Sequence, residues 1–396
     1  MPSGGEELTR RVLAALAEVQ DPELRRPLTE LGMIEGVEAP DAGGAGPVLV
    51  RLRLTIAACP AARRIEADVR RSAEAALREA GLALPVEVET GVMSPGQRRE
   101  LTERLRGGRG AAGRGAPKRV LAVASGKGGV GKSSVTANLA VALAQLGLRT
   151  AILDADVHGY SIPGLMGLGG AVPTRLDETI LPPVAHGVPC ISIGMFLGSD
   201  EELVAWRGPM LHRTLEQFLR DVHFGDPDVL LVDLPPGTGD IALSLAQLLP
   251  EAEVLVTTTP QPAAAEVAVR AGLLAERTGQ RVAGVVETMA GFTAPDGSRL
   301  ELFGSGGGAD VADRLTRARG APVPLLASIP LSLAWRRAGD AGVPVVLRDP
   351  ADPSARAVVA AARGLLPASG AARPLNLTPP RPADGSGAPG SARPSS

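Results

Sequence analysis

The 396-residue sequence has few aromatic side chains and almost no net charge. Aromatic residues make up only 2% of the chain, so the stacking platforms on which single-stranded nucleic acids bind are scarce. Lys and Arg number 41 against 43 Asp and Glu, and the formal charge of −2 gives no overall attraction to nucleic acid or to an anionic membrane. We therefore predict neither a nucleic-acid partner nor a membrane partner.

Cysteine and long apolar runs are also scarce. Cys59 and Cys190 are too few for a disulfide framework and lie far apart in the sequence, which is typical of proteins from reducing compartments. The N-terminus has no basic stretch followed by an apolar segment, and no run of 18 apolar residues occurs anywhere. These absences predict a cytoplasmic protein that is neither secreted nor membrane-spanning.

The composition that remains is that of a folded protein. Hydrophobic residues make up 44% and charged residues 21%, which excludes a fibrous or fully disordered chain. At roughly 100 to 200 residues per domain, the length allows two or three domains. The abundance of glycine (49) and proline (35) indicates many turns or flexible segments between them.

The first part of the chain predicts a small α+β domain over residues 1–105. Apolar residues recur at helical spacing over residues 8–19 and again over residues 62–80. Between them, residues 48–56 alternate between apolar and polar, as in a half-buried strand. Two valines within residues 86–88 indicate a further short strand.

The rest of the chain predicts a linker, an α/β domain and a tail. Residues 106–118 are mostly Gly, Ala and Arg without an apolar period, which is typical of a flexible linker. Over residues 119–366, short apolar runs alternate with helical patterns, which predicts a doubly wound, mostly parallel sheet covered on both faces. Residues 367–396 are rich in Pro, Gly, Ser and Ala, and we expect them to be disordered. The apolar runs are 120–124, 150–153, 229–232, 254–258, 282–286 and 324–329.

The clearest motif is GKGGVGKS at residues 126–133, between a strand pattern and a helical pattern. It matches G-x-x-x-x-G-K-S/T, a loop whose backbone N–H groups and following helix N-terminus bind phosphate oxygens. Lys132 would neutralise the β and γ phosphates, and Ser133 would ligate Mg²⁺. The sequence therefore predicts an ATP site whose binding residues are Gly126, Lys127, Gly128, Gly129, Val130, Gly131, Lys132, Ser133, Ser134, Asp154, Asp233 and Gly237.

Three aspartates follow the ends of predicted strands. Asp154 and Asp156 come after residues 150–153, and Asp233 follows residues 229–232 in DLPPGTGD. Doubly wound sheets bind ligands at the carboxyl ends of their strands, so we expect these carboxylates near the phosphates. Asp233 occupies the Walker B position next to Mg²⁺, and the backbone N–H of Gly237 can face a γ phosphate.

Lys127 is a second lysine that the general motif does not require. With it, GKGGVGKS resembles the deviant Walker A signature of the MinD, ParA, nitrogenase iron protein and Mrp class. That resemblance implies a homodimer in which Lys127 reaches the partner's nucleotide. It also implies that Asp156 orients the attacking water and that Asp154 helps to hold Mg²⁺, so the implied catalytic residues are Lys127, Lys132 and Asp156. The alternatives are a solvated loop lysine and aspartates that merely cap a turn.

Further motifs narrow the resemblance to the Mrp/ApbC iron–sulfur carrier ATPases. They are DADVHGYSIPG at residues 154–164, DLPPGTGD at 233–240 and residues 329–343. DPE at 21–23 and TIAACP at 55–60 make the N-terminal unit similar to the iron–sulfur-assembly domain found ahead of many bacterial Mrp proteins. The resemblance implies a slow ATPase that delivers a four-iron cluster to apo iron–sulfur proteins or assembly factors.

The sequence departs from that family at its cluster ligands. The family's C-P-x-C pair is missing, since the corresponding stretch reads ETMAGFTAPDG at residues 287–297, and neither Ala294 nor Asp296 replaces a thiolate. Thr288 stands where the family usually has the asparagine that reads adenine. Cys59 is then the one plausible cluster ligand, at a strand–helix junction where we expect a lowered thiol pKa. The alternatives are a core position for Cys59, as expected for Cys190, and an ATP-gated protein-interaction switch that has lost cluster binding.

Overall fold

The computed structural model describes most of the chain, and two of the predicted segments fall largely outside it. The linker residues 108–116 and the tail 367–396 are among those not described. The described residues are 4–40, 46–57, 59, 61–107, 117–157, 159–196, 208–237, 239–294 and 296–366.

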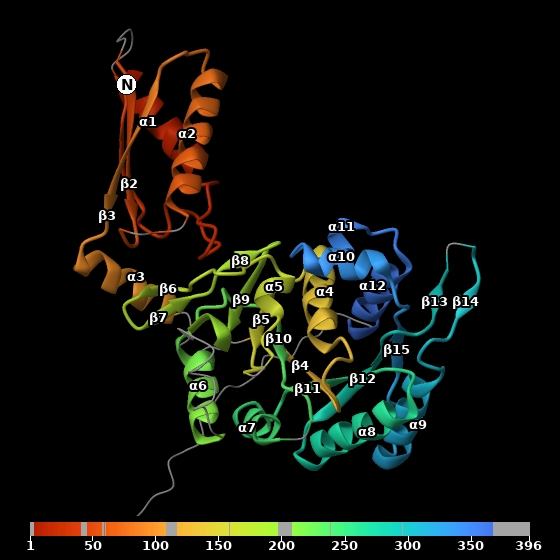
Figure 1. The fold of residues 1–396 in the computed structure, drawn as a ribbon. Helices are drawn as coiled ribbons and strands as arrows, with labels where there is room; N and C mark the ends of the chain where they lie inside the picture. The colour runs from red at the N-terminus through yellow and green to blue at the C-terminus, as the bar shows by residue number, and fades with distance from the viewer. Residues whose placement is uncertain are drawn as a thin grey trace, which may run out of the picture.

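The N-terminal unit is a three-stranded sheet with helices packed on it, as the periodicities predict (Figure 1). In the order β1-β2-β3, β1 runs antiparallel and β3 parallel to β2. The alternation in β2 places one set of side chains in a core with α1 and α2. Sequence reasoning missed β1 and α3. The elements are α1 (Gly4–Leu16), β1 (Ile34–Glu38), β2 (Val48–Leu54), α2 (Ala62–Glu79), β3 (Val86–Val92) and α3 (Pro95–Gly107).

The second unit contains an eight-stranded sheet in the order β15-β12-β11-β4-β10-β5-β9-β8. All neighbouring strands are parallel except the short edge strand β8, which pairs antiparallel with β9. The six predicted apolar runs are all strands of this sheet, so the doubly wound prediction is confirmed. The strands are β4 (Arg119–Ser125), β5 (Thr150–Asp154), β8 (Val184–Ala185), β9 (Val188–Ser192), β10 (Val229–Asp233), β11 (Glu253–Thr258), β12 (Arg281–Glu287) and β15 (Leu325–Ser328).

Helices cover both faces of this sheet, and each face has its own apolar core. One core is built with α6 (Gly208–Asp221), α7 (Asp240–Leu248), α8 (Pro262–Arg277) and α9 (Gly307–Arg319). The other is built with α4 (Lys132–Gln145), α5 (Ile162–Leu165), α10 (Leu333–Asp340), α11 (Val345–Arg348) and α12 (Pro353–Leu365). Because both faces are buried, the strands are apolar throughout instead of alternating.

Two short hairpins lie outside the main sheet, and the sequence patterns predicted neither. The first pairs β6 (Thr174–Leu176) with β7 (Thr179–Leu181) and lies beside α3 in Figure 1. The second pairs β13 (Phe292–Thr293) with β14 (Arg299–Leu300) and stands where the C-P-x-C pair was sought. A short 3₁₀ turn, η1 (Ile193–Phe196), follows β9. Among the described helices, none is both long and apolar enough to cross a membrane.

Candidate functional site

The loop between β4 and α4 has the backbone that its glycines predict. Gly129 and Gly131 adopt positive φ angles of 79° and 81°, which side chains with a Cβ rarely adopt. Gly126 is required for another reason, because a Cβ placed there would lie 2.4 Å from the carbonyl carbon of Val267 in α8. The loop is therefore held between the sheet edge and the backbone of α8, and α4 begins at Lys132 directly after it.

A cavity of about 530 Å³ opens at this loop, a size within the usual range for small-molecule sites. It brings together residues from the ends of three different strands, as expected for the carboxyl edge of a doubly wound sheet. Its lining residues are Ser125, Lys127, Gly128, Gly129, Gly131, Lys132, Ser133, Ser134, Asp156, Gly159, Ser161, Pro235 and Pro236. The other predicted residues, which are Gly126, Val130, Asp154, Asp233 and Gly237, are not among these lining residues.

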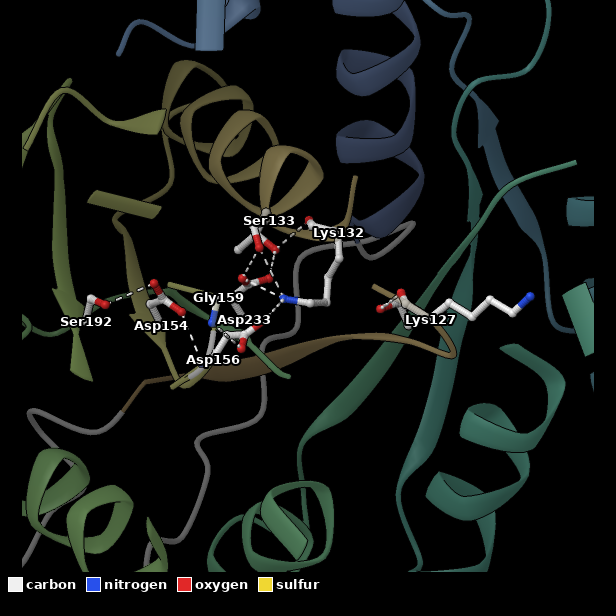
Figure 2. A network of polar contacts seen from close by, with 10 residues as sticks. Lys127, Lys132, Ser133, Asp154, Asp156, Gly159, Ser192 and Asp233 are labelled. Atoms are coloured by element: carbon white, nitrogen blue, oxygen red, sulfur yellow. Dashed lines mark hydrogen bonds and ion pairs between the residues drawn. The ribbon is translucent and has the colours of Figure 1, made fainter. Parts of the chain in front are cut away.

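The centre of the site is the ammonium group of Lys132 (Figure 2). Its Nζ lies 2.7 Å from Oδ2 of Asp233 and 3.7 Å from Oδ2 of Asp156. Asp233 also accepts hydrogen bonds from the hydroxyl of Ser133 and, at 2.7 Å, from that of Thr136. Sequence reasoning missed Thr136, which lies in α4 one helical turn after Lys132 and holds the Asp233 carboxylate through this hydrogen bond.

Asp154 lies behind Asp156 and holds it in place. Oδ1 of Asp154 accepts a hydrogen bond from the backbone N–H of Asp156 at 3.1 Å, and Oδ2 accepts one from the Ser192 hydroxyl at 3.0 Å. Oδ1 of Asp156 in turn accepts from the backbone N–H of Gly159 at 3.1 Å. Asp154 is fully buried, so it reaches the cavity through Asp156 and not directly. Ser192 is a second supporting residue that the sequence patterns did not reveal.

Three carboxyl groups surround the Lys132 ammonium behind the phosphate loop. Burial, followed by the charge of Asp233, raises the pKa of Asp154 to about 8. Burial also raises the pKa of Asp233, while Lys132 acts in the opposite direction. Such a group of acids is stabilised by a cation. The available donors are carboxylate and hydroxyl oxygens, which are the ligands that Mg²⁺ prefers.

Lys127 differs from Lys132 in the direction of its side chain. It is exposed, and Figure 2 shows it extending away from the Lys132 ammonium. Its backbone is nevertheless fixed, because its carbonyl accepts a hydrogen bond from the Ser125 hydroxyl at 3.0 Å. Lys127 therefore combines a fixed backbone with an exposed ammonium at the rim of the cavity.

Gly237, which was expected to face a γ phosphate, and Thr288 both bond to backbone carbonyls of the chain. The backbone N–H of Gly237 donates to the carbonyl of Ser125 at 2.8 Å, so it holds the two strand ends together and does not face the phosphate position. The hydroxyl of Thr288 donates to the carbonyl of Val130 at 2.6 Å and also bonds the carbonyl of Thr258. Thr288 therefore anchors the phosphate loop to β11 and β12, a role that the sequence did not predict.

Comparison with known proteins assigns this arrangement to a family. Residues 116–366 match the protein-family model of the ParA type described as NUBPL iron-transfer P-loop NTPase. The chain belongs to this family. Residues 9–83 match a second model, described as iron–sulfur cluster assembly protein.

Several relatives span nearly the whole of this iron-transfer NTPase. The "Iron-sulfur cluster carrier protein" of Mycobacterium tuberculosis (strain ATCC 25618 / H37Rv) is 54% identical over 349 residues, which cover 87% of this chain and 89% of that protein. The protein of the same name from Mycobacterium leprae is 51% identical over 364 residues, 91% of this chain and 93% of that protein. A solved nucleotide-binding protein from Archaeoglobus fulgidus, in complex with ADP, is 36% identical with a TM-score of 0.48 and covers 57% of this chain and 86% of that one.

The two cysteines of this NTPase have different surroundings. Cys190 is fully buried on β9, as expected for a core residue. Cys59 is 8% exposed and lies before α2, where its sulfur accepts hydrogen bonds from the backbone N–H groups of Ala61 and Ala62. The expected lowering of its pKa is wrong, because burial, followed by the charges of nearby carboxylates, outweighs those hydrogen bonds and raises it.

The described residues do not contain a complete binding site for a metal cluster. Within those ranges, no group of three or more His, Cys, Asp or Glu side chains is arranged to hold a metal ion. The β13–β14 hairpin carries Ala294 and Asp296 where thiolates would be needed.

Proposed function

We propose that this chain is an ATPase that carries iron–sulfur clusters and delivers them to apo-proteins. The observation that carries the proposal is the meeting of Lys132, Ser133, Asp233 and Asp156 at one cavity. The names of relatives that align over both units support the cluster as cargo. In this proposal, residues 1–105 form the assembly-type domain, 106–118 the linker, 119–366 the ATPase domain and 367–396 a tail.

The proposed hydrolysis gives a role to each group at the cavity. Lys132 would neutralise the β and γ phosphates, and the loop N–H groups would bind their oxygens. Ser133 and Asp233 would hold Mg²⁺, which supplies positive charge to the phosphate oxygens when bound, and Asp154 would help to hold the shell of the ion through Asp156. Asp156 lies at the cavity wall, where its carboxylate can orient the attacking water and accept its proton.

The proposed active form is a homodimer, and Lys127 is the residue that supports it. An exposed ammonium on a fixed loop, directed away from its own chain's Lys132, is suited to the phosphates of a nucleotide held by a second copy. Turnover would be slow as a monomer, because charge stabilisation of the transferring phosphoryl group would be incomplete.

The cargo would be bound through Cys59. Two copies supply two thiolates, so the receiving protein, an assembly factor or other thiols must complete the four ligands that such a cluster normally has. A site shared in this way is open to exchange, since part of its ligand set leaves with the partner. We propose that slow ATP turnover is coupled to this transfer.

A second candidate is an ATP-gated protein-interaction switch without a cluster. The observation that favours it is the hairpin at residues 292–300, whose Ala294 and Asp296 offer no thiolate. Both candidates share the nucleotide site and differ only in cargo.

Anaerobic reconstitution separates the two candidates. Wild type, Cys59→Ser and Cys190→Ala are incubated with iron, sulfide and an excess of a small thiol that can complete the ligand set, desalted, and examined by visible absorption and iron analysis. The carrier predicts a coloured wild type, a colourless Cys59→Ser and a coloured Cys190→Ala control. A colourless wild type that still hydrolyses ATP would exclude the carrier and favour the switch.

A further inference from the structure

The β6–β7 hairpin belongs to the cores of both units. Its cross-strand pairs place Thr174, Leu176, Thr179 and Leu181 on one face and Ile180 on the other. Leu176 and Leu181 are buried in the apolar core of the N-terminal unit, whereas Ile180 is buried in the core beneath the eight-stranded sheet. The hairpin therefore contributes side chains to both cores, and its movement would change the packing of both. We call the hairpin and its contact with the N-terminal unit the seam.

Polar contacts join the seam to the N-terminal unit. The hydroxyl of Thr174 donates to Oε1 of Glu23 at 3.1 Å, and the hydroxyl of Thr102 in α3 makes a longer contact of 3.5 Å with Asp177. Figure 1 shows α3 directly beside β6 and β7. Together with the buried leucines, these contacts fix the lower end of the N-terminal unit on the hairpin.

The same end of the N-terminal unit contains Cys59. Its side chain lies in the apolar core that also includes Leu176 and Leu181. The charges of Glu23 and Asp21 both act on the Cys59 thiol. The residue that Thr174 binds is thus an immediate part of the electrostatic environment of the cysteine.

In the other direction, the hairpin leads back to the nucleotide cavity within one short stretch of chain. Asp156, Gly159 and Ser161 line the cavity, and α5 follows immediately. Ile162 and Met166 anchor that stretch in the core against α4, and the chain then enters β6. The cavity wall and the hairpin are therefore joined by a short, anchored segment and not by a long loop.

One buried hydroxyl in the seam has no hydrogen-bond partner among the described residues. The hydroxyl of Thr179 is buried on the face turned to the N-terminal unit, and within the described part of the chain nothing hydrogen-bonds to it. An unsatisfied buried hydroxyl destabilises the arrangement that contains it. A shift of the hairpin that gave the Thr179 hydroxyl a hydrogen-bond partner would therefore stabilise a second arrangement of these residues.

We propose that the β6–β7 hairpin transmits the nucleotide state from Asp156 and Ser161 to the N-terminal unit and thereby changes the exposure of Cys59. The inference rests on the proposed function, since it needs a nucleotide at this cavity. It adds the element that would make cargo exchange at Cys59 depend on ATP.

Thiol labelling of the full-length wild type tests the inference directly, because the chain has only two cysteines. N-ethylmaleimide modification of each is followed by mass spectrometry with Mg²⁺–ADP and with a non-hydrolysable Mg²⁺–ATP analogue. We expect the rates at Cys59 to differ by about threefold or more, because labelling follows the population of the opened seam. Cys190 is fully buried and reports any global unfolding.

Variants on the two faces of the hairpin locate the effect. Leu176→Ala and Thr174→Val weaken the contact with the N-terminal unit. In both variants the Cys59 labelling rates with ADP and with the ATP analogue should become nearly equal, with nucleotide affinity retained. Arg175→Ala changes an exposed residue of the same strand and should keep the wild-type ratio. Should Leu176→Ala unfold, as labelling of Cys190 would reveal, Thr174→Val and the wild type still decide.

Two results would overturn the inference. One is a wild-type Cys59 rate that is the same with both nucleotides, although titration in the same samples shows both to be bound. The other is a ratio of Cys59 labelling rates with the two nucleotides that stays at the wild-type value in folded Leu176→Ala and Thr174→Val. A wild type that binds no nucleotide at all would instead remove the proposed function itself, so the two failures are distinguishable.

Discussion

Replacement of Asp156 separates binding from catalysis in the nucleotide site. Its Oδ1 accepts the Gly159 N–H, and its Oδ2 lies 3.7 Å from the Lys132 ammonium. Asp156→Asn keeps the shape and an acceptor for Gly159 but loses the charge and the ability to take a proton. Asp156→Ala removes the charge and also the acceptor for Gly159. A comparison of the two variants therefore isolates the contribution of the Gly159 contact.

The expected magnitudes follow from these contacts. A positioned acid or base contributes about 10²- to 10⁴-fold in rate, so the hydrolysis rate should fall at least about 100-fold in both variants. The Lys132–Asp156 pair is buried, and at an effective dielectric constant near 20 its attraction is about 4 kcal/mol. Because loss of that attraction frees the ammonium for phosphate, ATP affinity should stay within about threefold of wild type or increase.

Single-turnover hydrolysis and equilibrium titration with a fluorescent nucleotide measure the two quantities separately. Asp310→Asn serves as control, since Asp310 lies in the first turn of α9 and contacts Arg314 far from the cavity. Normal hydrolysis by Asp156→Asn would remove Asp156 from catalysis. Loss of binding in step with turnover would make it a binding residue instead.

Three further predictions concern the loop and the seam. Lys127→Ala should bind ATP normally but hydrolyse it at least about tenfold more slowly in assays across protein concentration, and unchanged turnover would argue against its action on a second copy. Gly126→Ala should lower the free energy of unfolding in urea by about 1–3 kcal/mol, because its Cβ meets the α8 backbone, whereas Gly128→Ala should not. Burial raises the pKa of Glu23 from 4.5 to about 7. Protonated Glu23 therefore makes its full contribution to the free energy of unfolding below pH 4.5, and this contribution is lost as the pH rises through about 7. Glu23→Gln should match wild type in urea midpoint at pH 4 and exceed it at pH 8; equal midpoints at pH 8 would refute the assignment.

The phosphate loop and the main sheet could be predicted from the sequence because their signals are local. GKGGVGKS is contiguous, and strands buried on both faces appear as short apolar runs. The aspartates could be placed because parallel strands end at one edge of the sheet. Each of these inferences needs only the residue, its neighbours in the sequence and the strand direction.

The residues that sequence reasoning missed act through contacts between distant segments. Ser192 meets Asp154, and Thr288 meets Val130, across strands that no pattern pairs in advance. The β6–β7 hairpin has strands too short for an alternating pattern to stand out, although its two faces serve two cores.

The pKa of Cys59 shows the same limit. The helix start was visible in the sequence, but the burial and the carboxylates that outweigh it depend on what packs over the thiol.

Titration of Mg²⁺–ATP against wild type and Lys132→Met tests the central claim most directly, because Lys132 joins the phosphate loop to Asp233 and Asp156. Methionine keeps most of the side-chain volume and removes the charge. The account predicts saturable binding by the wild type and a loss of affinity of at least about 100-fold in Lys132→Met, as expected when a desolvated charge contact to phosphate is removed. Equal affinities, or a folded wild type that binds no ATP, would contradict it.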